Sequence, residues 1–303
     1  MRTTALLFPF LLLFASPSQG QRPVSQYILD WSPKSGQVTL TCRDTPHRQA
    51  QVFEIQNLDP QSLARALNVP PNARALLYIH CWLGETRFFH RRSMGWLTHA
   101  LLASADTSPV VLIALRWPSG KRGYRHSASR AGEKGAGAAP LLRVLSEVFP
   151  DGRLDVFCHS MGNRFFQGMG PHPQPLSQRR GETRPVFGRV VLFSPDVDAD
   201  VFCTDFEHLE AASASIHLYT HRRDRALWLS KKFLHRPRLG RSGPTALPEG
   251  MALDVVDMTR LRSLSNHTHF ADKVVQRDLG RVFGVGWGAA GQVKRWSIWR
   301  AGF

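Results

Sequence analysis

Short runs that are almost entirely apolar recur through the middle of the chain and alternate with segments of helical periodicity. Strands that are apolar at every position are typical of a parallel sheet buried on both faces. We expect such strands at 75–80, 110–117, 154–158, 189–193 and 215–220. Apolar residues at helical spacing predict helices at 86–105, 139–149 and 160–168. Together these elements predict an open α/β sheet with helices on both faces.

The first part of the chain has a different pattern. Two polar-flanked segments, 37–42 and 51–55, predict short strands in an antiparallel start to the sheet. Before them, a positive start at Met1-Arg2, an apolar run at 5–15 and small residues near Gly20 are typical of a secretory signal peptide. We therefore expect residues 1–20 to direct export to the periplasm or the medium.

The remaining chain is long enough for one large domain, which we place at 21–280, followed by a glycine- and tryptophan-containing tail at 281–303. A segment rich in proline, arginine and glycine, 170–185, is predicted to be an inserted loop. It could cover a site as a lid or simply be a tolerated surface insertion, and the sequence favours the insertion.

The formal net charge of +16 adds one constraint on partners. The arginines are spread along the chain, and no nucleic-acid-binding motif or basic run interleaved with aromatics is present, which argues against a nucleic-acid partner. A basic surface would suit peripheral contact with an acidic envelope surface. Four cysteines, Cys42, Cys81, Cys158 and Cys203, fit no zinc-binding spacing, and their pairing is left open.

The stretch LDVFCHSMGNRF, residues 154–165, carries the candidate chemistry. A serine at a sharp turn between a buried strand and a helix exposes its Oγ at the sheet edge, where it can act as a nucleophile. Such a turn needs small residues two positions before and after the serine, and Cys158 and Gly162 flank Ser160 in this way. The backbone N–H of Met161 would then stabilise an oxyanion, with a second donor from Cys81 or Trp82 after strand 75–80. The alternative is an ordinary turn that contains serine and glycine.

Acyl transfer by serine also needs a base and an acid that orients it, which in this chain order lie downstream of the serine. Asp224 follows strand 215–220 and is favoured by its position, and Asp196, after strand 189–193, is the alternative acid. Two late histidines, His267 and His269, are candidates for the base.

Several motifs occur in order between about residues 73 and 280: Trp117-Pro118-Ser119, CHSMGNR at 158–164, SPDVDADVF at 194–202, the run 223–230, PRLG at 237–240 and the H-x-x-F at 267–270. As a set they resemble a bacterial α/β-hydrolase family of unknown function, whose members are predicted serine esterases. The resemblance implies an α/β-hydrolase fold. It aligns His267 with the expected base and favours Asp224 as the acid.

The sequence thus predicts a serine hydrolase that cleaves small carboxylic esters or thioesters through an acyl-enzyme, with Ser160, His267 and Asp224 as its triad. This chemistry requires no metal and no organic cofactor. The alternative from another class is a catalytically silent protein of the same fold that binds an envelope lipid or a partner.

Overall fold

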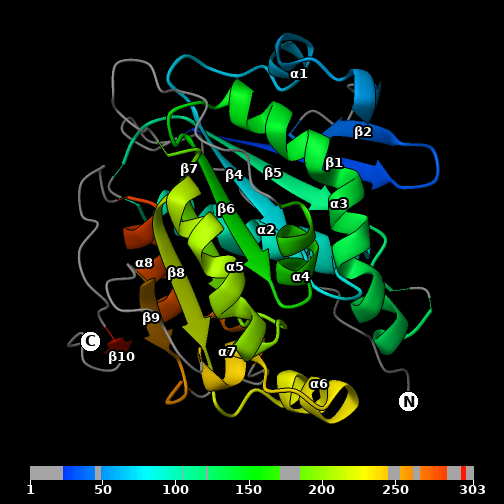
Figure 1. Ribbon diagram of the computed structural model, residues 1–303. Coiled ribbons are helices and arrows are strands. Elements are labelled where there is room, and N and C mark those ends of the chain that lie inside the picture. The colour runs from blue at the N-terminus through cyan, green and yellow to red at the C-terminus, as the bar shows by residue number, and fades with distance from the viewer. Residues whose placement is uncertain are drawn as a thin grey trace, which may run out of the picture.

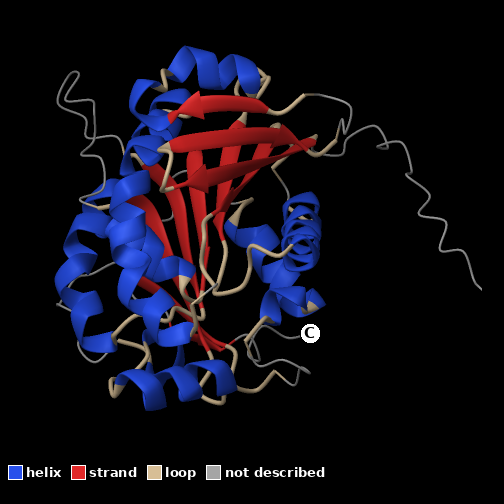
Figure 2. Cartoon of the chain, turned by 90° about the vertical axis from the view of Figure 1, so that its right-hand side faces the viewer, coloured by secondary structure: helices blue, strands red, loops and turns tan. Residues whose placement is uncertain are grey.

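The computed structural model describes residues 23–44, 49–104, 106–120, 122–170, 185–244, 253–261, 267–284 and 295–297. The predicted signal peptide, nearly all of the inserted loop and most of the tail lie outside these residues. In the described part, one 10-stranded sheet lies between two layers of helices (Figures 1 and 2). No helix among these residues is long and apolar enough to span a bilayer.

The sheet has the strand order β10-β9-β8-β7-β6-β4-β5-β1-β2-β3. Its strands are β1 (Val24–Ser32), β2 (Gln37–Cys42), β3 (Gln51–Glu54), β4 (Arg74–Ile79), β5 (Val110–Arg116), β6 (Leu154–His159), β7 (Phe187–Phe193), β8 (Ser213–Thr220), β9 (Leu253–Asp257) and β10 (Arg295–Ser297). The pairs from β10 across to β1 are parallel, and β2 and β3 continue the sheet in antiparallel pairing. The predicted parallel sheet and antiparallel start are both present.

The helices are α1 (Pro60–Ala66), α2 (Arg87–Leu102), α3 (Tyr124–Val148), α4 (Gly162–Gly168), α5 (Ala199–Ala212), α6 (Arg225–Leu234), α7 (Leu239–Ser242) and α8 (Lys273–Val282), with 3-10 turns at η1 (Ile55–Asn57) and η2 (His269–Ala271). One face of the sheet packs against α1, α3, α4 and α5, and the other packs against α2 and α8. The helices α6 and α7 lie beyond the carboxyl ends of the strands (Figure 1).

The central strands are buried because successive side chains enter two different cores. On β4, Leu77 and Ile79 belong to the core under α3 and α4, whereas Leu76 and Tyr78 belong to the core under α2 and α8. This alternation explains why the strand is apolar at every position.

Helix α3 begins at Tyr124, well before the helix that periodicity predicts at 139–149. Its first half is missed because the buried face consists of small residues rather than large apolar ones. A Cβ atom on Gly135 would lie 1.9 Å from the carbonyl oxygen of Phe165, and one on Gly168 would lie 2.0 Å from that of Gly132. The small residues therefore let α3 approach α4 at backbone contact, which fixes the helix that follows Ser160.

Candidate active site

Ser160 lies between β6 and α4, at the carboxyl edge of the sheet. Its φ of 54° is a left-handed conformation that is costly for a residue with a side chain. Neighbouring backbone holds it there: its N–H donates to the Phe193 carbonyl at 3.0 Å, and its own carbonyl accepts from the N–H of Asp196 at 3.1 Å. Asn163 adds a side-chain hydrogen bond to that carbonyl at 3.0 Å. The predicted turn is thus a strained strand-to-helix elbow.

Gly162 lets the elbow come close to the neighbouring strand. A Cβ atom at this position would lie 2.5 Å from the carbonyl oxygen of Ile79 and 2.7 Å from that of His80. Both are backbone atoms at the end of β4, so no side chain fits between the elbow and this strand. The close approach brings the start of α4 next to the loop that begins at Cys81.

His267 and Asp224 are joined by a hydrogen bond of 2.7 Å between the imidazole Nδ1 and carboxylate Oδ2. The other carboxylate oxygen, Oδ1, accepts from the N–H of Leu227 at 2.9 Å and so caps the N-terminus of α6. Asp224 is completely buried. A carboxylate at a helix N-terminus is stabilised by the unpaired N–H groups and the helix dipole.

The hydrogen bond to Asp224 determines which nitrogen of the His267 imidazole carries the proton, and it raises the pKa of the ring. Burial lowers the pKa of His267, but the charge and hydrogen bond of Asp224 outweigh it, and the pKa ends above its ordinary value. With Nδ1–H donating to the carboxylate, Nε2 carries the lone pair of the neutral ring. His267 also lies against the residue before Ser160, because its ring centroid is 4.9 Å from that of His159.

His159 is a site residue that the sequence did not reveal. Its Nε2 donates to the backbone carbonyl of His267 at 2.9 Å, and the ring is fully buried. Burial lowers the pKa of His159 well below its ordinary value, so the ring is neutral and holds its proton on Nε2. In the sequence, His159 is only the last residue of a buried strand before the serine. Its hydrogen bond to the His267 carbonyl is visible only in the structure.

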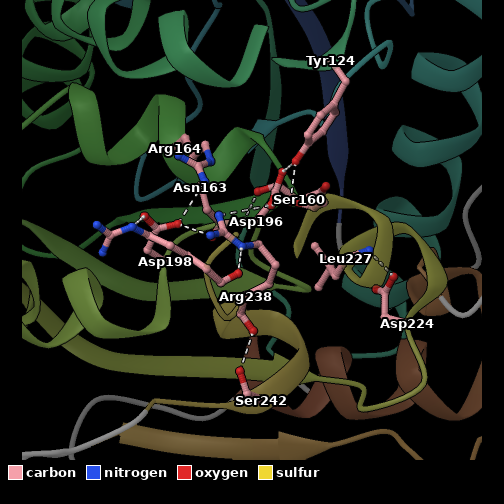
Figure 3. A network of polar contacts seen from close by, with 12 residues as sticks. Tyr124, Ser160, Asn163, Arg164, Asp196, Asp198, Asp224, Leu227, Arg238 and Ser242 are labelled. Carbon is pink, nitrogen blue, oxygen red and sulfur yellow. Dashed lines mark hydrogen bonds and ion pairs between the residues drawn. The ribbon is translucent and has the colours of Figure 1, made fainter. Parts of the chain in front are cut away.

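The alternative acid, Asp196, is engaged elsewhere. Its carboxylate accepts hydrogen bonds from the Tyr124 hydroxyl and, at 2.6 Å, from the Ser230 hydroxyl. The buried Arg238 guanidinium lies 3.9 Å from Oδ1. Figure 3 shows Asp196 in the centre of this network, while Asp224 lies apart at the start of α6. Asp196 therefore ties α3, α6 and the elbow backbone together.

The two backbone groups predicted to stabilise an oxyanion lie on either side of this close approach. Met161 is the N-cap of α4 and Cys81 begins the loop after β4. In the part of the chain that the structure describes, the Met161 N–H donates to no other backbone group, and the Cys81 N–H interacts with the thiol of its own residue. Burial raises the pKa of the Cys81 thiol to about 12, so the thiol stays protonated.

His80 connects two strand ends instead of acting as a base. Its Nε2 accepts from the Trp117 N–H at 3.1 Å, and its carbonyl accepts from the Trp117 indole at 3.0 Å. Burial lowers its pKa to about 4, so it remains neutral. These bonds hold the loop after β4 against the end of β5.

His269, the other late histidine, has no hydrogen bond to a carboxylate among the described residues. Its ring stacks on His221 with centroids 4.6 Å apart, and among the described residues neither ring nitrogen has a hydrogen-bond partner. Burial lowers its pKa to about 4. The geometry therefore separates it from His267, which lies two residues earlier.

The three cysteines whose side chains the structure describes add no reactive thiol to the site. Cys42, Cys81 and Cys158 are free thiols, and the side chain of Cys203 lies outside the described residues. Cys158 is completely buried in the core, and burial raises its pKa well above the ordinary value. Within the described residues, no group of three or more His, Cys, Asp or Glu side chains is arranged to hold a metal ion.

A mostly parallel sheet, a strained serine after β6 and a histidine–carboxylate pair contributed by later segments define an α/β-hydrolase fold. Residues 61–279 match the family described as alpha/beta hydrolase of unknown function (DUF900), and the chain belongs to this family. The match confirms the predicted fold class and the family resemblance. Neither the comparison with curated proteins nor that with solved structures gives a significant match.

Proposed function

We propose that this chain is a serine hydrolase that cleaves small carboxylic esters or thioesters through an acyl-enzyme. The observation that carries the proposal is the His267 Nδ1 to Asp224 bond of 2.7 Å, with the His267 ring 4.9 Å from that of His159, the residue before a serine held at φ 54°. A neutral imidazole with its lone pair on Nε2, next to a serine elbow, is the arrangement that activates a hydroxyl.

The reaction follows from these groups. The Oγ of Ser160 attacks the acyl carbon while His267 Nε2 takes its proton, and Asp224 stabilises the imidazolium that forms. The N–H groups of Met161 and Cys81 donate to the oxyanion of the tetrahedral intermediate. His267 then protonates the leaving alcohol or thiol, and a water molecule that it deprotonates releases the acid from Ser160.

We also propose that the protein acts after export, since residues 1–20 have the pattern of a signal peptide. Its substrates would then be esters or thioesters that occur in the envelope or the medium. Fractionation of cells into cytoplasmic, periplasmic and secreted material tests this location. Recovery of the full-length chain only in the cytoplasm would contradict it.

Covalent labelling by a fluorophosphonate probe tests the nucleophile. Wild-type protein should be labelled and Ser160→Ala should not. Ser194→Ala is a matched control, because Ser194, like Ser160, is buried and follows a strand at positive φ, but it lies outside the proposed triad. A folded wild-type protein that resists the probe would instead favour the silent binding protein.

The base is tested by hydrolysis of p-nitrophenyl acetate. His267→Ala should reduce turnover by about a thousandfold or more. His269→Ala should largely preserve it, since the Asp224 carboxylate bonds to His267 while the His269 ring stacks on His221. The reverse result would move the base by two residues.

A further inference from the structure

The outer face of α6 exposes large apolar side chains. Trp228, Leu229 and Phe233 are 47%, 46% and 37% exposed, whereas Leu227 and Ser230 of the same helix are buried. These are three of the seven large apolar side chains that are exposed among the described residues. The helix begins directly after Asp224, at the carboxyl edge of the sheet (Figure 1).

The same face is strongly basic. Segment 222–236 contains six exposed arginine or lysine side chains, namely Arg222, Arg223, Arg225, Lys231, Lys232 and Arg236. Its only acidic residue, Asp224, is buried and bonded to His267. Within this segment no exposed carboxylate offsets the positive charge, and from outside it the Asp198 carboxylate lies 3.9 Å from the Arg236 guanidinium.

Cations and aromatic rings are interleaved on this surface. The Lys232 ammonium lies 5.6 Å from the ring centroid of Trp228, and the Arg125 guanidinium of α3 lies 5.5 Å from that of Phe233. The apolar side chains are therefore bordered by positive groups on long, flexible stems. An amphipathic helix of this kind suits the boundary between lipid headgroups and acyl chains, where aromatic rings insert and cations remain at the headgroups.

We propose that the outer face of α6, together with Arg125, binds the surface of a membrane that contains anionic phospholipid. Charge complementarity selects this partner, because the exposed groups of the segment are all cationic or neutral and the chain as a whole carries +16. The inference goes beyond the proposed hydrolysis and does not depend on it. Membrane contact at α6 would place Ser160 and its edge of the sheet close to the lipid surface.

Vesicle flotation with the Ser160→Ala protein tests the proposal without interference from any turnover. The probe is phosphatidylcholine vesicles with or without phosphatidylglycerol. We expect the protein to float with the anionic vesicles and not with the neutral ones. Binding should weaken steeply as salt is raised from about 0.15 M to about 1 M, since the Debye length falls from about 8 Å to about 3 Å.

Two variants on α6 and two matched controls locate the surface. Lys231→Glu with Lys232→Glu should weaken binding at least about tenfold, and Trp228→Ser with Phe233→Ser should also weaken it. Lys273→Glu with Arg277→Glu makes the same charge change on exposed positions of α8, on the far side of the sheet, and should retain more binding. Leu102→Ser is the corresponding control for an exposed apolar residue. Thermal unfolding of each variant shows that it is folded.

Several outcomes would overturn the proposal. These are failure of the wild-type surface to bind anionic vesicles, equal binding to neutral vesicles, or equal loss in the α8 control. A concentration-dependent dimer that Trp228→Ser abolishes would instead assign the face to a second copy of the chain. If the double apolar variant does not fold, the charge-reversal pair and the salt dependence still decide the question.

Discussion

The imidazole of His159 holds the backbone of His267: its Nε2–H donates to the His267 carbonyl oxygen at 2.9 Å. His159 is also the residue directly before Ser160, so one side chain fixes the distance between the strand that carries the serine and the segment that carries the histidine. We regard His159 as a positioning residue, because its hydrogen bond is to the backbone carbonyl of His267 and not to the imidazole that takes the proton.

Replacement of His159 tests this role. His159→Phe fills similar space but cannot donate, and removal of one buried hydrogen bond costs about 1–3 kcal/mol. We expect kcat for p-nitrophenyl acetate to fall at least about tenfold with a smaller change in KM. His159→Gln keeps an N–H donor and should recover part of the loss. Equal activity of wild type and His159→Phe would remove the positioning role.

Substitution of the two candidate acids, Asp224 and Asp196, should have opposite effects on activity and stability. Asp224→Asn retains the cap on α6 but loses the carboxylate that orients His267, and we expect turnover to fall by about 10⁴-fold. Asp196→Asn disturbs hydrogen bonds to Tyr124 and Ser230 and should cost stability more than activity. Ester hydrolysis and thermal unfolding of both variants measure the difference. A larger activity loss in Asp196→Asn would reverse the assignment.

The pH dependence of hydrolysis follows from His267. His267 must be neutral to act as the base, and the charge of Asp224 keeps the pKa of His267 above its ordinary value of 6.5. We therefore expect kcat/KM to rise with pH through an inflection above 6.5 and to be lost on the acid side. In Asp224→Asn, where the carboxylate charge is absent, the residual activity should show its inflection at lower pH. An unchanged inflection would mean that Asp224 does not control the base.

Acid stability is governed by other histidines. Burial lowers the pKa of His90 to about 3, so the unfolded chain takes up a proton near pH 6.5 while the folded chain does not. The folded state therefore loses stability as pH falls from about 6.5 towards 3, by about 1.4 kcal/mol per pH unit for one such group. His267 has the opposite sign, since its raised pKa contributes stability below about 6.5 that is lost as pH rises through its folded pKa.

Denaturant unfolding at pH 7 and pH 5 checks this expectation. His90→Phe keeps a ring in the buried position and removes one titrating group, so its stability should fall less on acidification than that of wild type. The difference should be about 1.4 kcal/mol per pH unit. Parallel pH profiles for the two proteins would show that His90 takes up its proton in the folded state.

Gly162 provides a test of the elbow geometry. Gly162→Ala would place a methyl group within 2.7 Å of two backbone carbonyls, so either the elbow or the end of β4 must move. We expect loss of esterase activity together with a clear drop in melting temperature. Gly95→Ala is the matched control, because a Cβ in that part of α2 meets nothing within 4 Å. This control should be stabilised by up to about 1 kcal/mol through helix propensity.

Much of the fold could be predicted because the central strands are apolar at every position, as at 75–80 and 154–158. The first half of α3 was missed because its buried face is made of Ala and Gly, which give no apolar periodicity. The candidate site residues Ser160, Asp224 and His267 follow from chain order and motif. The role of His159 and the partners of Asp196 depend on contacts between distant segments, which a single sequence does not display.

The carboxylate of Asp224 divides its two oxygens between the N–H of Leu227 and the Nδ1 of His267. The first turn of α6 and the proposed base are therefore linked through one rigid, buried group. A displacement of the first turn of α6 would shift the Asp224 carboxylate and, through it, the imidazole of His267, without any movement of the sheet. A substitution that moves the first turn of α6 would therefore move the carboxylate that orients His267.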